Sequence, residues 1–104
     1  MTTTLKTVNP RGVLDGAATN ELKNQVMDLL DDNTESVLVD MQDITFMNST
    51  GIGAMVAILK ALKAQNKSLY LCGLSDQVKM IFQLTKMDRV FKIYPDRQTL
   101  EAAL

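Results

Sequence analysis

The chain has 104 residues, 46% of them hydrophobic and 22% charged, with a formal net charge of −1. These values are typical of a soluble globular protein with a single core, so we expect one domain over residues 1–104. No basic block is present, which argues against a nucleic-acid partner, and no apolar stretch approaches the ~20 residues of a membrane span. The sequence contains no histidine, which excludes Ser-His-Asp and Cys-His catalysis, histidine phosphorelay and histidine metal sites.

The N-terminal part is predicted to form a broken strand followed by a helix. Residues 4–16, "TLKTVNPRGVLDG", have the composition of a short strand region interrupted at Asn9 and Pro10. A proline at such a place indicates an edge strand or a bulge. Asp15 and Gly16 then turn the chain into a helix with apolar residues on one face. The residues of this face are Leu22, Val26, Leu29 and Leu30.

A buried strand and a second helix are predicted for the middle of the chain. Residues 36–41, "SVLVDM", form a near-continuous apolar run that suits a central strand buried on both faces. Residues 44–47, "ITFM", either extend the sheet or lead into a loop. The helix that follows has a wide apolar stripe with lysines outside it. This stripe consists of Ile52, Met55, Val56, Leu59 and Leu62.

The C-terminal part is predicted to contain two more strands and two more helices. Residues 68–73, "SLYLCG", are predicted to be a buried strand, with Cys72 a core residue rather than a reactive thiol. A single cysteine rules out an internal disulfide and favours a cytosolic setting. Ser75 and Asp96 are predicted to cap the two helices, with the strand "VFKIY" between them. The first of these helices is predicted to turn four residues to the core: Val78, Ile81, Phe82 and Leu84.

The order of these elements alternates between strand and helix along the whole chain. Such alternation predicts an α/β domain with a largely parallel sheet. The irregular start of the chain predicts that this sheet is mixed.

The stretch "MNSTGIG", residues 47–53, lies where a predicted strand gives way to a helix. In open α/β sheets ligands and partners gather at such turns, and a helix start offers free N–H groups and the positive end of the helix dipole. The turn is therefore suited to hold a phosphate or to present a serine for phosphorylation. The structural alternative is that Ser49 or Thr50 caps the helix and the glycines only pack. The methionines are mostly predicted to fill the core, and contact with a partner is the alternative for Met47 and Met55, which flank the motif.

Three other functions fit the sequence poorly. No Walker loop is present, and "GIGAMV" is one residue short of the dinucleotide fingerprint, with no acid at the end of the next strand. Asp40 ends a strand as the phosphorylated aspartate of a receiver does, but a receiver also needs an acidic pair, and Asp15 stands alone. A small enzyme would have little catalytic chemistry available, so we expect no catalytic residue, metal or cofactor.

Three segments of the sequence together resemble one known family. "RGVLDG", "VLVDMQDITFMNSTGIGAMVAIL" and "LCGLSDQVKMIFQLTKMDRVFKIY" are similar to the STAS domain, in its form as an anti-sigma factor antagonist. The resemblance extends from about Val8 to Leu104. The motif of that family is Asp-Ser-(Ser/Thr)-Gly-hydrophobic-Gly, and residues 48–53 match it except that Asn48 replaces the aspartate. The first strand region also looks shorter than usual.

The resemblance implies a STAS-like fold and a switch that works without enzymatic activity. Proteins of this type bind an anti-sigma factor that is also a serine kinase, and this kinase ends the interaction by phosphorylating the motif serine, here Ser49. A metal-dependent serine phosphatase restores the interaction. We expect the protein to act in the cytoplasm, with neither a nucleic acid nor a membrane as its partner. The resemblance places the partner contacts at Asp15, Asn48, Thr50, Gly51, Ile52 and Gly53. Three alternatives stay open. Asp15 is either a partner contact or only a helix cap, and Thr50 is either a partner contact or a second modified residue. The whole domain is either an anti-sigma factor antagonist or a STAS scaffold or regulatory module with a non-sigma target.

Overall fold

A computed structural model describes residues 5–104. The chain alternates between short strands and helices, as the pattern of the sequence predicts. The strands are β1 (Leu5–Val8), β2 (Gly12–Leu14), β3 (Ser36–Asp40), β4 (Ile44–Met47), β5 (Ser68–Cys72) and β6 (Lys92–Tyr94). The helices are α1 (Gly16–Leu29), α2 (Ser49–Ala64), α3 (Asp76–Leu84) and α4 (Arg97–Ala103), with a 3₁₀ turn, η1 (Met87–Arg89), between α3 and β6.

The strands form two parallel sheets. The larger sheet has the order β1-β3-β5-β6, and the smaller consists of β2 and β4. The α/β class with a parallel sheet is confirmed. Every strand pair within residues 5–104 is parallel, which differs from the mixed sheet that the irregular start of the chain predicts. The reason is that β2 does not fold back on β1 but pairs with β4, and β4 runs in the same direction.

The start of the chain is broken where the sequence predicts. β1 ends at Val8, before Asn9 and Pro10, and it is an edge strand of the larger sheet. β2 has a register shift between Gly12 and Val13, so the predicted irregularity is present in the second half of the broken strand. The break lets the two halves of one apolar segment join different sheets.

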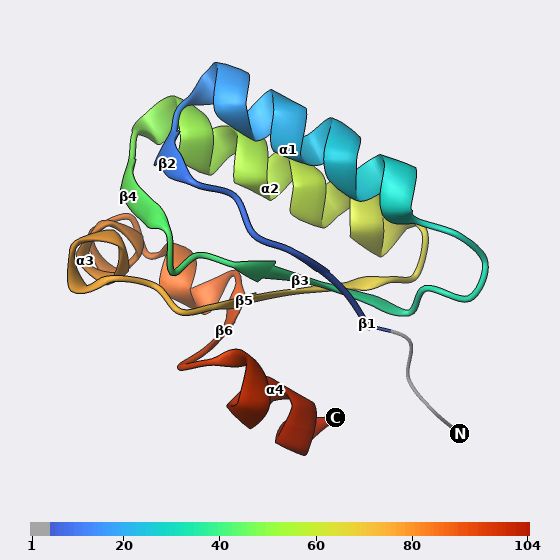
Figure 1. The fold of residues 1–104 in the computed structure, drawn as a ribbon. Helices are drawn as coiled ribbons and strands as arrows, with labels where there is room; N and C mark the ends of the chain where they lie inside the picture. The colour runs from blue at the N-terminus through green and yellow to red at the C-terminus, as the bar shows by residue number, and fades with distance from the viewer. Residues whose placement is uncertain (1–4) are drawn as a thin grey trace.

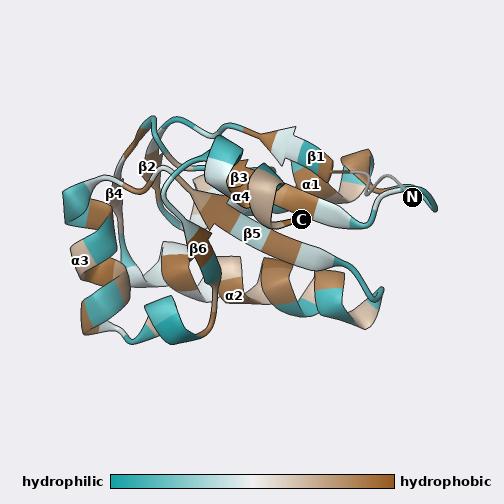
Figure 2. Ribbon diagram, turned by 90° about the horizontal axis from the view of Figure 1, so that it is seen from below, coloured by the Kyte–Doolittle hydropathy of each residue, from teal (hydrophilic) through white to brown (hydrophobic). Residues whose placement is uncertain are grey.

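Helices cover both faces of the larger sheet (Figure 1). α1 and α2 lie side by side on one face, α4 lies on the other, and α3 lies at one end beside β4. The main core fills the space between the sheet and the helices α1 and α2, and Figure 2 shows hydrophobic bands along β5 and α2. β3 is buried along nearly its full length, as expected for a central strand. None of the helices within residues 5–104 combines the length and the apolar character that crossing a bilayer requires.

A smaller core lies between the sheet and α4. Leu38, Tyr70 and Cys72 pack there against Leu100 of the helix. Burial, followed by the nearby carboxylates of Asp40 and Asp96, raises the pKa of the Cys72 thiol to about 11. A thiol with so high a pKa is a poor nucleophile, so the interpretation of Cys72 as a core residue is confirmed.

The core faces of the helices are mostly those that the sequence predicts, with one clear error in α3. Val78 and Phe82 are fully buried, but Leu84 is 77% exposed. An α-helix turns by about 100° per residue, so Leu84 points about 200° away from Phe82. The prediction that Leu84 belongs to the core is therefore wrong. Ser75 caps α3 and Asp96 caps α4, as predicted.

Candidate functional site

The candidate site lies where β2 and β4 lead into two neighbouring helices. Leu14, the last residue of β2, is paired with Met47, the last residue of β4. The next residues, Asp15 and Asn48, are the N-caps of α1 and α2. The backbone N–H of Asn48 donates a hydrogen bond of 3.4 Å to the carbonyl oxygen of Leu14, which ties the two turns together. Two helix N-termini therefore lie next to each other at one edge of the molecule.

Asn48 is the residue that caps α2. Its backbone is extended, with φ −97° and ψ 175°, and its Oδ1 accepts a hydrogen bond of 2.8 Å from the N–H of Gly51. The interpretation that Ser49 or Thr50 is the cap is wrong, because the capping residue is the last extended residue before the helix and both hydroxyl residues already lie inside it. Asparagine caps helices about as well as aspartate. The replacement of the usual aspartate by Asn48 therefore keeps the local fold.

Ser49 is the first residue of α2, and its side chain is free. The residue is exposed, and no hydrogen bond within residues 5–104 involves its hydroxyl. The N–H groups of Ser49 and Thr50 have no partner inside the helix, because the first N–H groups of any helix lack one. An added negative charge at the Ser49 hydroxyl would lie at the positive end of the helix dipole.

Asp15 performs the same structural role at the start of α1. Its Oδ1 accepts a hydrogen bond of 2.9 Å from the N–H of Ala18. The hydroxyl of Thr19 donates a bond of 2.6 Å to the Asp15 carbonyl oxygen. The interpretation of Asp15 as a helix cap is confirmed, and its predicted contact with a partner stays a prediction.

The glycines of the two turns differ in what surrounds them. A methyl group on Gly51 would collide with the carbonyl oxygen of Leu14, so this glycine lets α2 start close to β2. A methyl group on Gly16 would lie 2.7 Å from Cγ2 of Thr50, so this glycine makes room for the neighbouring helix. Gly53 is exposed, and nothing lies within 4 Å of the place where its Cβ would be. Gly16 and Gly51 thus have packing roles, whereas packing does not require a glycine at residue 53.

The other predicted contact residues are divided between the surface and the core. Thr50 is exposed beside Ser49, whereas Ile52 is buried beneath the turn. The partner contacts predicted for Thr50, Gly51, Ile52 and Gly53 stay predictions. Met47 and Met55 are fully buried, so these two methionines are not available to a partner and the suggestion that they contact one is wrong.

Two exposed apolar residues beside the site were missed in the sequence. Val13 and Phe46 are paired across β2 and β4, one residue before the buried pair Leu14 and Met47. Side chains alternate between the two faces of a strand, so the residue before a buried strand end faces outward. This alternation was a signal for Val13. It did not identify Phe46, because the alternation is interrupted in β4, where Thr45 and Phe46 are both exposed between the buried Ile44 and Met47.

Asp40, which would be the phosphorylated residue if the domain were a receiver, is occupied by local hydrogen bonds. Its carboxylate accepts hydrogen bonds of 3.1 and 3.2 Å from the backbone and the side chain of Gln42. Asp15 follows β2 in the other sheet and is occupied as a cap. No group of three or more His, Cys, Asp or Glu side chains in the described part of the chain could hold a metal ion. The arrangement gives no support to aspartate phosphorylation.

Comparison with known proteins gives consistent matches. The model of the STAS domain matches residues 2–100. The anti-sigma-B factor antagonist of Staphylococcus aureus (strain NCTC 8325 / PS 47) is 35% identical over 74 residues, which cover 71% of this chain and 68% of that protein. A candidate anti-sigma factor antagonist from Thermotoga maritima has a similar structure, with a TM-score of 0.82 and 22% identity over 95% of this chain and 86% of that one. The Bacillus cell fate determinant SpoIIAA in its phosphorylated form has a TM-score of 0.68 at 15% identity, over 100% of this chain and 95% of that one.

Proposed function

The chain belongs to the STAS domain family, and from this premise we propose that it is an anti-sigma factor antagonist controlled by phosphorylation of Ser49. The unmodified protein binds an anti-sigma factor that is also a serine kinase, and the phosphorylated protein does not. The relatives named anti-sigma-B factor antagonists support the antagonist role. The observation that carries the choice of residue is that Ser49 is exposed and unbonded at the start of α2 while Asn48 alone caps the helix.

Phosphorylation at this place would change the surface without unfolding the domain. A phosphate adds a charge of about −1.5 to −2 at neutral pH. The free N–H groups at the start of α2 favour such a charge, so the fold tolerates it. A partner packed over the same turn would have to bury that charge without compensation, which costs several kcal/mol. A single covalent change thus breaks the interface and leaves the fold intact.

Two other proteins act on this chain in the proposed switch, and the chain itself catalyses no reaction. The kinase is the anti-sigma factor itself, and a metal-dependent serine phosphatase regenerates the binding form in the cytoplasm. Asp15 lies at the neighbouring helix start, where its carboxylate is within the proposed footprint of the kinase. Asn48 caps α2 without adding a second carboxylate beside Ser49.

Phosphorylation by the cognate anti-sigma factor kinase tests the proposal. The protein is incubated with the kinase and ATP, and the modified residue is identified by mass spectrometry. We expect phosphate on Ser49, stable to hydroxylamine, and none on a Ser49→Ala variant. Binding is then measured for the Ser49→Ala and Ser49→Asp variants, and we expect the kinase to bind the first only. Modification at a residue outside the turn, or no modification, contradicts the proposal. A domain that binds a different protein in both forms would instead be a STAS scaffold.

A further inference from the structure

Exposed apolar side chains concentrate at the end of the molecule that carries Ser49. Six large hydrophobic residues are exposed within residues 5–104, and four of them lie on β2, β4 and α3. β4 packs against both β2 and α3, so these elements adjoin one another. The four side chains and their exposed fractions are Val13 (47%), Phe46 (41%), Met80 (59%) and Leu84 (77%). We call these four residues the outer apolar face.

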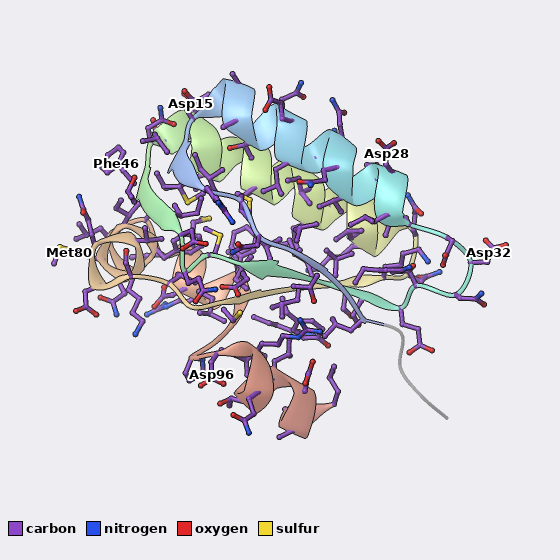
Figure 3. The ribbon with its side chains drawn as sticks, in the orientation of Figure 1. Asp15, Asp28, Asp32, Phe46, Met80 and Asp96 are labelled. Atoms are coloured by element: carbon purple, nitrogen blue, oxygen red, sulfur yellow. The ribbon has the colours of Figure 1, made fainter. Side chains whose placement is uncertain are left out.

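The fold explains why these side chains point outward. Leu14 and Met47, the last residues of β2 and β4, are buried, and the paired residues before them, Val13 and Phe46, are exposed and face away from the core. On α3 the buried residues are Val78 and Phe82, which leaves Met80 and Leu84 on the opposite side of the helix. Figure 2 shows α3 as alternating hydrophobic and hydrophilic bands. Figure 3 shows Phe46 and Met80 pointing away from the body of the molecule, on the side on which Asp15 also lies.

The outer apolar face begins beside the turn of the proposed switch and extends over β4 to the neighbouring helix α3. Phe46 precedes Ser49 by three residues along the same chain segment, and Val13 precedes Asp15 by two. A stable protein interface covers about 800 Å² on each partner, far more than a turn of a few residues supplies. The centres of such interfaces are enriched in aromatic residues and methionine. A protein seated on Ser49 must therefore extend over neighbouring surface, and the apolar part of that surface leads along β4 to α3.

We propose that the outer apolar face is a second contact for the same anti-sigma factor that meets Ser49, and this inference rests on the proposed function. The four side chains carry no charge and no modifiable hydroxyl, so their contact supplies affinity without sensing phosphorylation. The turn at Ser49 then supplies the switch. The partner should present a cluster of apolar side chains next to the surface that covers Ser49.

Substitutions at Met80 and Leu84, with a matched control at Leu104, test this division of roles. Leu84→Gln and Met80→Gln change exposed helix residues to a residue that favours helices, so both variants should fold, which circular dichroism and thermal unfolding verify. Leu104→Gln is the control, since Leu104 is 50% exposed at the end of α4, on an element remote from α3. The affinity for the cognate anti-sigma factor is measured by calorimetry for each variant, for Ser49→Asp and for the wild type.

We expect the Met80→Gln/Leu84→Gln double variant to bind about tenfold more weakly than the wild type and Leu104→Gln to bind equally well. The double variant should still be phosphorylated on Ser49 at saturating kinase, because its turn is unchanged. If the double variant binds like the wild type while Ser49→Asp does not bind, the inference is wrong and the proposed function stands. If Ser49→Asp binds like the wild type, the proposed function is wrong and the inference with it. Light scattering measures whether each protein is a dimer. If the wild type is a dimer and the double variant is a monomer, the outer apolar face serves self-association and the inference is wrong.

Discussion

The starts of α1 and α2 have the same construction and different first residues. Each follows a strand of the small parallel sheet, and each is capped by a side-chain oxygen that accepts the N–H three residues later, at 2.9 Å for Asp15 and 2.8 Å for Asn48. α1 then begins with Gly-Ala-Ala, whereas α2 begins with Ser-Thr-Gly. The first helix start thus forms without a hydroxyl at the positions that Ser49 and Thr50 occupy in the second.

This difference shows which features of the two turns the fold requires and which it does not. A side-chain cap and a glycine that allows close packing are present in both turns, and both are explained by local hydrogen bonds and packing. The hydroxyl of Ser49 is present in one turn only and makes no side-chain hydrogen bond within the described residues. It is therefore surplus to the structure of the turn, which is why we assign it to function.

The largest expected effect concerns the packing of the two turns against each other. Gly51→Ala would bring a methyl group into collision with the carbonyl oxygen of Leu14, a backbone atom that cannot rotate away. We expect the variant to lose at least about 2 kcal/mol of unfolding free energy, measured by urea denaturation.

Gly53→Ala is the matched control for this substitution. The space around Gly53 is open, so the added methyl group meets nothing and the helix gains about 0.5–1 kcal/mol from the better helix former. Equal stability of the two variants would show that Leu14 can move and that the turns are not held together as described.

An intermediate effect is expected for the two caps. Asp15→Ala and Asn48→Ala each remove the acceptor of one helix N–H group, so each should lower the free energy of unfolding by about 1 kcal/mol. Asn48→Asp, which restores the usual residue of the family, keeps an acceptor and should leave stability within about 0.5 kcal/mol of the wild type. Chemical denaturation of the three variants measures these differences. A loss on Asn48→Ala much smaller than on Asp15→Ala would mean that a hydroxyl of Ser49 or Thr50 can take over the cap.

Local rules predicted much of the fold. The break at Asn9 and Pro10, the buried central strand and the caps Ser75 and Asp96 all depend on residues close in the sequence, and the structure shows each of them. The choice among Asn48, Ser49 and Thr50 could not be made in this way. All three residue types can cap a helix, and only the position at which the backbone becomes helical decides between them.

The remaining errors arose from contacts between distant segments. The pairing of β2 with β4 in a separate parallel sheet joins segments about 30 residues apart, and no local pattern specifies it. Only the folded chain shows that Met47 and Met55 are fully buried, which excludes the alternative that they contact a partner. The error at Leu84 is of another kind, because the helical spacing alone places this residue about 200° from Phe82. The motif serine was found because its neighbours form a specific order, and its phosphorylation stays a prediction.

The smallest expected effect on stability is the one on which the functional argument depends. Ser49→Ala removes a hydroxyl that is exposed and unbonded, so the free energy of unfolding should stay within about 0.5 kcal/mol of the wild type. Thr19→Val is the contrasting variant, because the buried hydroxyl of Thr19 donates to the Asp15 carbonyl oxygen at 2.6 Å, and loss of that bond should cost about 1 kcal/mol. Both are measured by urea denaturation. A Ser49→Ala variant as unstable as Thr19→Val would give the Ser49 hydroxyl a structural task, and the assignment of Ser49 to a switch would lose its physical basis.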